Sequence, residues 1–272
     1  VTLATSDAIV KHLTSVYAVA QILWIRYALY ASYGSWVAYS EAGLNGFRSA
    51  RPWLQIARGS VLVCANMVFL FAFSQLPLAD VHAVLAAAPL FITRASVLVL
   101  GEVVGYRRWV AISIGFVGVL IILRPGIGVF EPITLVPVLG TLLYSSYQIL
   151  TKVVSRHDPQ GTTQFFTGMS GFLWFSLMAP FGWITPAPDA WFWLAMTAVA
   201  GTLAHIFIIK GLHLAPASTV QPFSYSMLVA ASILGFLVFD DIPDTPTIVG
   251  ALIVVASGLY AFHRESVVAS KG

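Results

Sequence analysis

Long apolar stretches separated by short polar segments recur along the whole 272-residue chain. Most of these stretches reach about 20 residues, the length that an α-helix needs to cross a bilayer. Charges, turn residues and prolines predict ten spans, near 1–13, 16–40, 53–74, 78–101, 107–124, 132–154, 161–184, 189–212, 215–239 and 246–263. The loops between them are short, so no separate soluble domain is expected.

Composition agrees with this pattern. Hydrophobic residues make up 58% of the chain and charged residues 9%, whereas a soluble protein carries about 25% charged residues. A soluble enzyme, a disordered chain and a nucleic-acid-binding module are therefore excluded. The expected fold is an all-α membrane protein. The first residue is Val1, and the first apolar stretch is shorter than the others, so span 1–13 is interpreted as a truncated helix.

The positions of Lys and Arg predict an orientation, because cytoplasmic loops are enriched in these residues. With an even number of spans, both termini lie on the same side of the membrane. If that side is the cytoplasm, nine basic residues lie inside and two, Lys11 and Arg124, lie outside. The nine are Arg48, Arg51, Arg107, Arg108, Lys152, Arg156, Lys210, Arg264 and Lys271. We therefore expect a multi-pass protein of the bacterial inner membrane with both termini cytoplasmic.

The two halves of the chain resemble each other. Residues 71–91 read FAFSQLPLADVHAVLAAAPLF and residues 208–228 read IIKGLHLAPASTVQPFSYSML, each with Leu-x-Leu-Ala before a proline-containing helix of small residues. TSDAIVKHL (5–13) likewise resembles SSYQILTKV (145–153). A five-span repeat is odd in number, so its two copies enter the membrane from opposite sides, as in many secondary transporters. The repeats are expected over 1–125, with the first helix truncated, and 131–265.

These motifs resemble the ten-helix EamA-type branch of the drug/metabolite transporter superfamily. The resemblance covers nearly the whole chain and is most specific in FSQLPLADV followed by APLF, in LGEVVGYRRWVAISIGFVGVLIILRPG, and in PFSYSMLVAASILGFLVFDDIPDTPTIVGALIVVASGLYAFHRES. It implies a single-subunit carrier of small metabolites, with the aromatic amino-acid exporters as the nearest group. It also implies that Glu102 is the helix-4 Glu of the family, whereas Asp240 and Asp241 replace the Gly-Glu of the second half.

Charged residues within the spans are the first candidates for a transport site, because a charge at the bilayer centre costs at least ~2.5 kcal/mol and tends to face a cavity or a partner. Arg26 is expected either to hold a substrate carboxylate or to pair with Asp7. Asp7 and Lys11 lie four residues apart on one helix face. They form either an intrahelical ion pair or a site for a proton or a substrate amine.

Histidines and the remaining arginines give weaker signals. His82 opens a helix near the expected outer gate and is a candidate for substrate binding, proton coupling or gating, since histidine changes charge near neutral pH. A neutral hydrogen-bonding role is equally compatible. For His205 the structural role is favoured. Arg58 and Arg94 lie nearer the cytoplasmic ends and are expected to extend their side chains toward the membrane surface.

Aromatic and amide residues at midplane depth complete the predicted substrate site. They are Trp24, Asn66, Phe69, Tyr144, Tyr147, Gln148, Gln221 and Tyr225. Tyrosine can stack on a ring and also hydrogen-bond a polar group, which suits an amphipathic substrate; the alternative, an interfacial aromatic belt, fits the central tyrosines poorly. Pro89 and Pro222 interrupt corresponding helices of the two halves and are candidate hinges, because proline removes a backbone hydrogen bond.

Together these features predict a secondary transporter that exports small amphipathic metabolites, with aromatic or apolar amino acids expected first, by alternating access around a central cavity. Import of a cofactor-like or nucleoside-like metabolite is the main alternative. An intramembrane enzyme would need acidic residues and histidines at one depth, and a channel would need a continuous polar stripe; neither is indicated.

The sequence carries no Walker-type loop, HExxH, CxxC or Gly-x-Ser-x-Gly motif. No catalytic residue, metal site or cofactor is therefore expected. The expected partners are the substrate, with an amino acid first, and the lipid bilayer; no nucleic acid or obligate protein partner is indicated.

Overall fold

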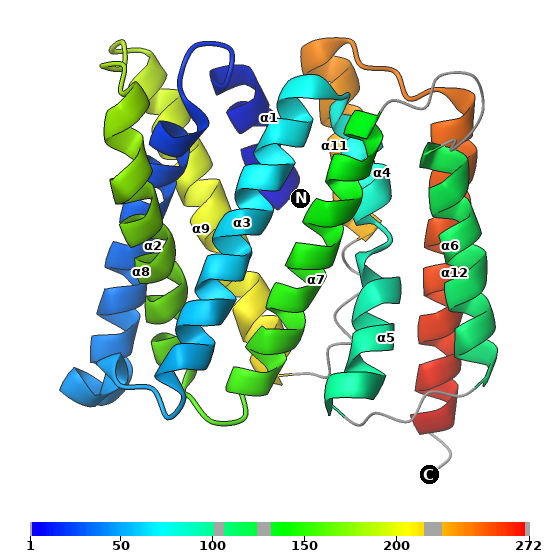
Figure 1. Ribbon diagram of the computed structural model, residues 1–272, viewed down its shortest axis with the longest axis horizontal. Coiled ribbons are helices and arrows are strands. Elements are labelled where there is room, and N and C mark those ends of the chain that lie inside the picture. The colour runs from blue at the N-terminus through cyan, green and yellow to red at the C-terminus, as the bar shows by residue number, and fades with distance from the viewer. Residues whose placement is uncertain (1, 101–105, 124–131, 215–224, 270–272) are drawn as a thin grey trace.

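The computed structural model describes residues 2–100, 106–123, 132–214 and 225–269, which form a bundle of helices (Figure 1). The first half contains α1 (Thr2–Leu13), α2 (Val19–Ala42), α3 (Pro52–Gln75), α4 (Leu78–Leu85), α5 (Ala88–Leu100) and α6 (Tyr106–Leu123). The second half contains α7 (Val136–Val154), α8 (Gln160–Met178), α9 (Ala190–Leu214), α11 (Tyr225–Phe239) and α12 (Thr245–Ala269). Short 3-10 turns are η1 (Gly43–Phe47), η2 (Pro132–Leu135) and η3 (Ala179–Gly182). No strand occurs within these ranges.

The helix boundaries follow the predicted spans closely. α3 matches the span predicted at 53–74, and α9 matches the span at 189–212. The span predicted at 161–184 ends early, because α8 stops at Met178 and the chain passes into η3 and then an extended segment. α12 extends to Ala269, beyond the predicted end at 263. Of the span predicted at 215–239, the structure describes residues 225–239.

Helix length and composition support a membrane protein. Four segments of the described residues are long and apolar enough to cross a bilayer: Pro52–Gln75, Leu78–Val99, Pro132–Val154 and Ala190–Leu214. Shorter apolar helices cover Trp109–Ile122, Ser226–Phe239 and Thr245–Tyr260. Large apolar side chains such as Leu98, Phe207 and Leu237 are exposed on the bundle surface, as expected where lipid replaces water. The number of crossings and the inverted relation of the halves stay predictions.

Helices from different halves of the chain pack against each other. α2 packs on α8, α6 on α12, α3 on α7 and α1 on α9. In Figure 1 the α2–α8 and α6–α12 pairs form the two sides of the bundle, with α1, α3, α7 and α9 between them. Small residues allow the closest approaches: a Cβ on Gly168 of α8 would lie 2.7 Å from Ala31 Cα of α2, and one on Gly118 of α6 would lie 2.8 Å from the carbonyl oxygen of Gly250 in α12.

The predicted interruption at Pro89 is present. α4 ends at Leu85, Ala86 and Ala87 form a turn, and α5 begins at Ala88. Proline fits the first turn of a helix because its missing N–H would have no partner there. Whether the break acts as a hinge stays a prediction.

Several of the basic residues from which the orientation is predicted lie at one end of the bundle. η1, the α7–α8 junction and the end of α12 lie at the lower end in Figure 1, and the α11–α12 junction lies at the upper end. Arg48 and Arg51 follow η1, Lys152 lies in the last turn of α7, and Arg156 belongs to the α7–α8 junction. The lower end is therefore rich in positive charge, but which side of the membrane it faces stays a prediction.

Candidate functional site

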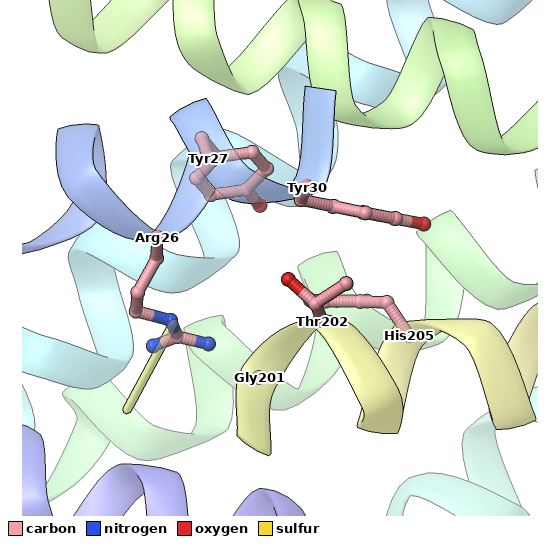
Figure 2. A pocket seen from close by; sticks show the side chains of 6 residues that line it. All are labelled: Arg26, Tyr27, Tyr30, Gly201, Thr202 and His205. Atoms are coloured by element: carbon pink, nitrogen blue, oxygen red, sulfur yellow. The ribbon is translucent and has the colours of Figure 1, made fainter. Parts of the chain in front are cut away.

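Two small cavities lie between the helices of the two halves. The smaller, of about 10 Å³, is lined by Arg26, Tyr27, Tyr30, Gly201, Thr202 and His205 (Figure 2). The larger, of about 30 Å³, is lined by Leu3, Asp7, Leu62, Ala65, Asn66, Phe69, Leu70, Phe73, Leu85, Tyr144, His205 and Met227. A cavity needs about 10–15 Å³ of such volume to hold one water molecule, so the smaller cavity has room for about one and the larger for about two. His205 lines both cavities.

Arg26 places a buried charge in the smaller cavity. Its side chain is 4% exposed and extends from α2 toward α9. Gly201 leaves room for it, because a Cβ there would lie 2.7 Å from Arg26 Nη2 and 2.8 Å from Nε. Arg26 Nη1 has no hydrogen-bond partner among the described residues, and the same holds for Thr202 Oγ1 and His205 Nδ1. Three polar atoms on one cavity are thus free to bind a ligand.

The aromatic wall of this cavity holds His205 in place. The His205 ring stacks on Tyr30, with centroids 5.3 Å apart and planes inclined by 10°. The Tyr30 hydroxyl donates to Gln164 Oε1 at 2.5 Å, which fixes the tyrosine between α2 and α8. A ring clamped in this way keeps its free nitrogen at a defined position, as a binding site requires.

The larger cavity combines aromatic rings with an amide. Asn66 Nδ2 donates to the Tyr27 hydroxyl at 2.8 Å and to the Leu62 carbonyl at 3.1 Å. Phe69 meets Tyr144 edge to face, with centroids 6.5 Å apart. The predicted candidates Asn66, Phe69 and Tyr144, from α3 and α7, therefore line one space.

Asp7 adds a buried carboxylate to the same cavity. Its Oδ2 lies 3.6 Å from His82 Nε2, and both side chains are almost fully buried. The His82 ring stacks on Phe73 at 5.3 Å. Within the described residues, neither His82 nitrogen has a hydrogen-bond partner. The ion pairs of these residues include no contact between Asp7 and Arg26, so the predicted alternative of an Arg26–Asp7 pair is wrong.

The predicted intrahelical pair of Asp7 and Lys11 is also wrong. Lys11 Nζ lies 2.6 Å from Asp241 Oδ2, a residue 230 positions away in the sequence. The ammonium group also donates to the Leu76 carbonyl at 3.4 Å and lies 4.7 Å from the ring centroid of Phe239. Lys11 occupies the last turn of α1, where its long side chain reaches these groups at the end of the bundle.

Arg58 does not extend to the membrane surface as predicted; it is completely buried. Its guanidinium donates to Gln55 Oε1 at 2.8 Å, to Thr167 Oγ1 at 2.7 Å, to the Thr163 carbonyl at 3.0 Å and to Thr151 Oγ1 at 3.2 Å. The Gln55 amide in turn donates to Asp158 Oδ2 at 2.7 Å. Arg58 therefore joins α3, α7 and α8.

Several predicted site residues lie elsewhere. Trp24 packs between α2 and α8, where its Nε1 donates to Ser176 Oγ at 2.9 Å, and lines neither cavity. Tyr147 is buried below the Arg58 guanidinium, 5.4 Å from its Cζ. Gln148 is buried in α7 and also lines neither cavity. Gln221, Pro222 and the side chain of Tyr225, like Glu102, lie outside the described residues.

The sequence reasoning missed four residues of the smaller cavity: Tyr27, Tyr30, Gly201 and Thr202. It also assigned His205 a structural role, whereas the structure places it on both cavities. No group of three or more His, Cys, Asp or Glu side chains that could hold a metal ion occurs in the part of the chain that is described.

Comparison with known proteins gives the family. Residues 132–262 match the model of the EamA-like transporter family. A riboflavin transporter of Rhizobium johnstonii is 30% identical over 230 residues, covering 82% of this chain and 74% of that protein. The chain belongs to the EamA-like transporter family. It is thus a membrane transporter and not an enzyme, and the family match falls on the second of the two predicted repeats.

Other comparisons extend this result. An S-adenosylmethionine uptake transporter of Rickettsia prowazekii is 25% identical over 223 residues, covering 82% of this EamA-like chain and 76% of that protein. A solved crystal structure with 16% identity covers 95% of this chain and 93% of its own, with a TM-score of 0.73, which shows the fold alone. The names of these relatives, which are S-adenosylmethionine and riboflavin transporters, do not support the predicted export of aromatic amino acids.

Proposed function

We propose that this EamA-like transporter imports a cofactor-like metabolite that joins a planar ring to charged groups, with S-adenosylmethionine as the first candidate. The observation that carries the proposal is the composition of the larger cavity. This cavity is lined by a carboxylate, an amide and two aromatic rings, from Asp7, Asn66, Phe69 and Tyr144. His205 also lines it and borders the smaller cavity, which contains Arg26.

The helix arrangement supports alternating access by two halves. Under the repeat predicted from sequence, α2 corresponds to α8, α6 to α12, and α1 and α3 to α7 and α9. The observed pairs α2–α8 and α6–α12, together with α1–α9 and α3–α7, are those that a two-fold relation between the halves would produce. A site at the interface of two inverted repeats is typical of secondary transporters. We therefore retain ten spans, repeats over 1–125 and 131–265, and both termini in the cytoplasm as part of the proposal.

Charge favours S-adenosylmethionine over riboflavin. S-adenosylmethionine carries a carboxylate, an ammonium group and a sulfonium cation on an adenosine, whereas riboflavin is uncharged. A buried carboxylate and a buried arginine are each costly without a partner. A neutral ligand such as riboflavin gives them no charged partner, whereas a zwitterion does. Here Asp7 faces the cavity where a cation would bind and Arg26 lies beyond His205. The riboflavin transporters among the relatives make riboflavin the second candidate.

The test is counterflow in proteoliposomes of the purified chain. Vesicles loaded with unlabelled S-adenosylmethionine are diluted into labelled S-adenosylmethionine, and transient accumulation of label is followed without any ion gradient. We expect accumulation above that of empty vesicles, inhibition by external S-adenosylmethionine, and little inhibition by tryptophan. Uptake by intact cells that produce the chain tests the direction of transport.

Two tyrosine variants provide a matched comparison. Tyr144→Ala removes a ring from the larger cavity, and Tyr39→Ala removes one from an exposed position of α2. We expect Tyr144→Ala to reduce counterflow roughly tenfold, because stacking of a base on an aromatic ring is worth about 1–3 kcal/mol, and Tyr39→Ala to leave it unchanged. Counterflow of riboflavin but not of S-adenosylmethionine would replace the first candidate by the second. Counterflow of neither compound would refute the proposal.

A further inference from the structure

Two arginines are buried among the side chains that the structure describes, and they differ in their hydrogen bonds. Arg58 donates to four acceptors from Gln55, Thr151, Thr163 and Thr167, as a structural arginine should. Arg26 is equally enclosed, yet its Nη1 has no acceptor among the residues that the structure describes. A buried charged donor without an acceptor is costly and rare. Packing alone therefore does not explain why Arg26 is there.

Two further polar atoms without partners face the same pocket. Thr202 Oγ1 and His205 Nδ1 are buried, and neither finds a partner in the described parts of the chain. Figure 2 shows the Arg26 side chain from α2 and those of Thr202 and His205 from α9 around one space. A guanidinium, a hydroxyl and an imidazole together offer donors to an anion, and the guanidinium fork matches a carboxylate in particular.

We propose that Arg26, Thr202 and His205 form a carboxylate subsite, and that the transported metabolite is therefore a carboxylate-bearing zwitterion. The inference rests on the proposed function and deepens it. Arg26 holds the carboxylate, Thr202 and His205 complete its hydrogen bonds, and Asp7 in the adjoining cavity faces the cationic part of the same molecule.

The position of Arg26 depends on the absence of a side chain at residue 201. A Cβ on Gly201 would lie 2.7 Å from Arg26 Nη2 and 3.0 Å from its Cζ, closer than real Cβ contacts. Alanine at this position must therefore displace the guanidinium while it leaves every charge in place. Gly235 of α11 offers a matched control, because its nearest contact would be an ordinary 3.7 Å to Asp241 Cβ.

The experiment compares two probes that differ only in the carboxylate: S-adenosylmethionine and decarboxylated S-adenosylmethionine. Each competes with labelled S-adenosylmethionine for counterflow, and the concentration for half-inhibition is measured. In the unaltered chain we expect the decarboxylated compound to need a concentration for half-inhibition that is roughly tenfold higher or more. A site built to hydrogen-bond a carboxylate strongly rejects a compound that lacks this group. In Arg26→Gln the two compounds should become equal within about twofold.

The glycine variants give an independent reading should Arg26→Gln fail to fold. Gly201→Ala should lower the ratio of the two half-inhibition concentrations, as Arg26→Gln does, and Gly235→Ala should leave this ratio unchanged. Equal inhibition by both probes in the unaltered chain would overturn the carboxylate subsite and leave the proposed function intact. A ratio that stays near tenfold in folded Arg26→Gln would also overturn it. No counterflow of S-adenosylmethionine in the unaltered chain would instead remove the first candidate of the proposed function, and no counterflow of riboflavin either would refute that function.

Discussion

The contact between Lys11 and Asp241 gives the most direct energetic prediction. It joins the end of α1 to the segment after α11, with 2.6 Å between Nζ and Oδ2. The two side chains are 17% and 22% exposed, so water still reaches the pair. An exposed ion pair contributes about 0.2–1 kcal/mol, and breaking a fully buried pair costs about 3–5 kcal/mol. We therefore expect a coupling free energy of about 1–2 kcal/mol between these values.

A double-mutant cycle measures this coupling. Lys11→Met, Asp241→Asn and the double variant are compared with the unaltered chain, and the free energy of unfolding is measured in mixed detergent micelles. Each single change should destabilise the protein, and the double change should cost about 1–2 kcal/mol less than their sum. A second cycle with Arg156→Met and Asp189→Asn, which are exposed and form no ion pair with each other, should show no coupling.

The result that would refute the reasoning is a coupling below about 0.5 kcal/mol, the usual error of additivity for independent sites. Such a result would mean that solvent screening cancels the attraction between the two charges in the micelle-bound protein. It would also remove the electrostatic link between the first and second halves at this end of the bundle.

Three further changes test the packing. Arg58→Met should lower the free energy of unfolding by about 3 kcal/mol or more, because it removes the charged donor of a buried hydrogen-bond network and leaves the acceptors, among them Gln55, without it. Unfolding in detergent measures this loss. Gly168→Ala should destabilise the α2–α8 contact by about 1–3 kcal/mol, since its Cβ would meet the Ala31 backbone at 2.7 Å, and thermal unfolding reports the loss. Asp240→Gly should raise thermal stability by about 1 kcal/mol, because Asp240 has a φ of 54°, which glycine adopts more readily; the same melting experiment should show a higher midpoint.

The charges, turn residues and prolines that interrupt the apolar stretches predicted most helix boundaries, because each boundary depends on local composition. α3 and α9 begin and end where charged or turn residues interrupt apolar runs, and the interruption at Pro89 is visible for the same reason. The depth of a charge along a helix also identified Arg26 and Asp7 as candidates, and both line a cavity.

Contacts that depend on helix rotation or on distant partners could not be predicted in this way. Arg58 lies near a helix end, which favoured an exposed head group, but its side chain faces α7 and α8 and is buried. Lys11 pairs with a residue 230 positions away, which no local spacing encodes. Gly201, Thr202 and His205 follow the i, i+1, i+4 spacing of one α9 surface, yet small residues in a membrane helix usually indicate packing.

The position of His205 between the two cavities has a consequence for the length of a ligand. A short molecule that occupies only one cavity can leave the imidazole stacked on Tyr30, where the rings are 5.3 Å apart. A molecule that contacts both Arg26 and Asp7 must be long enough to pass this ring, which lines both cavities and stays stacked on Tyr30. His205 therefore sets a minimum length, because only a ligand that extends past the ring gains contacts at both ends.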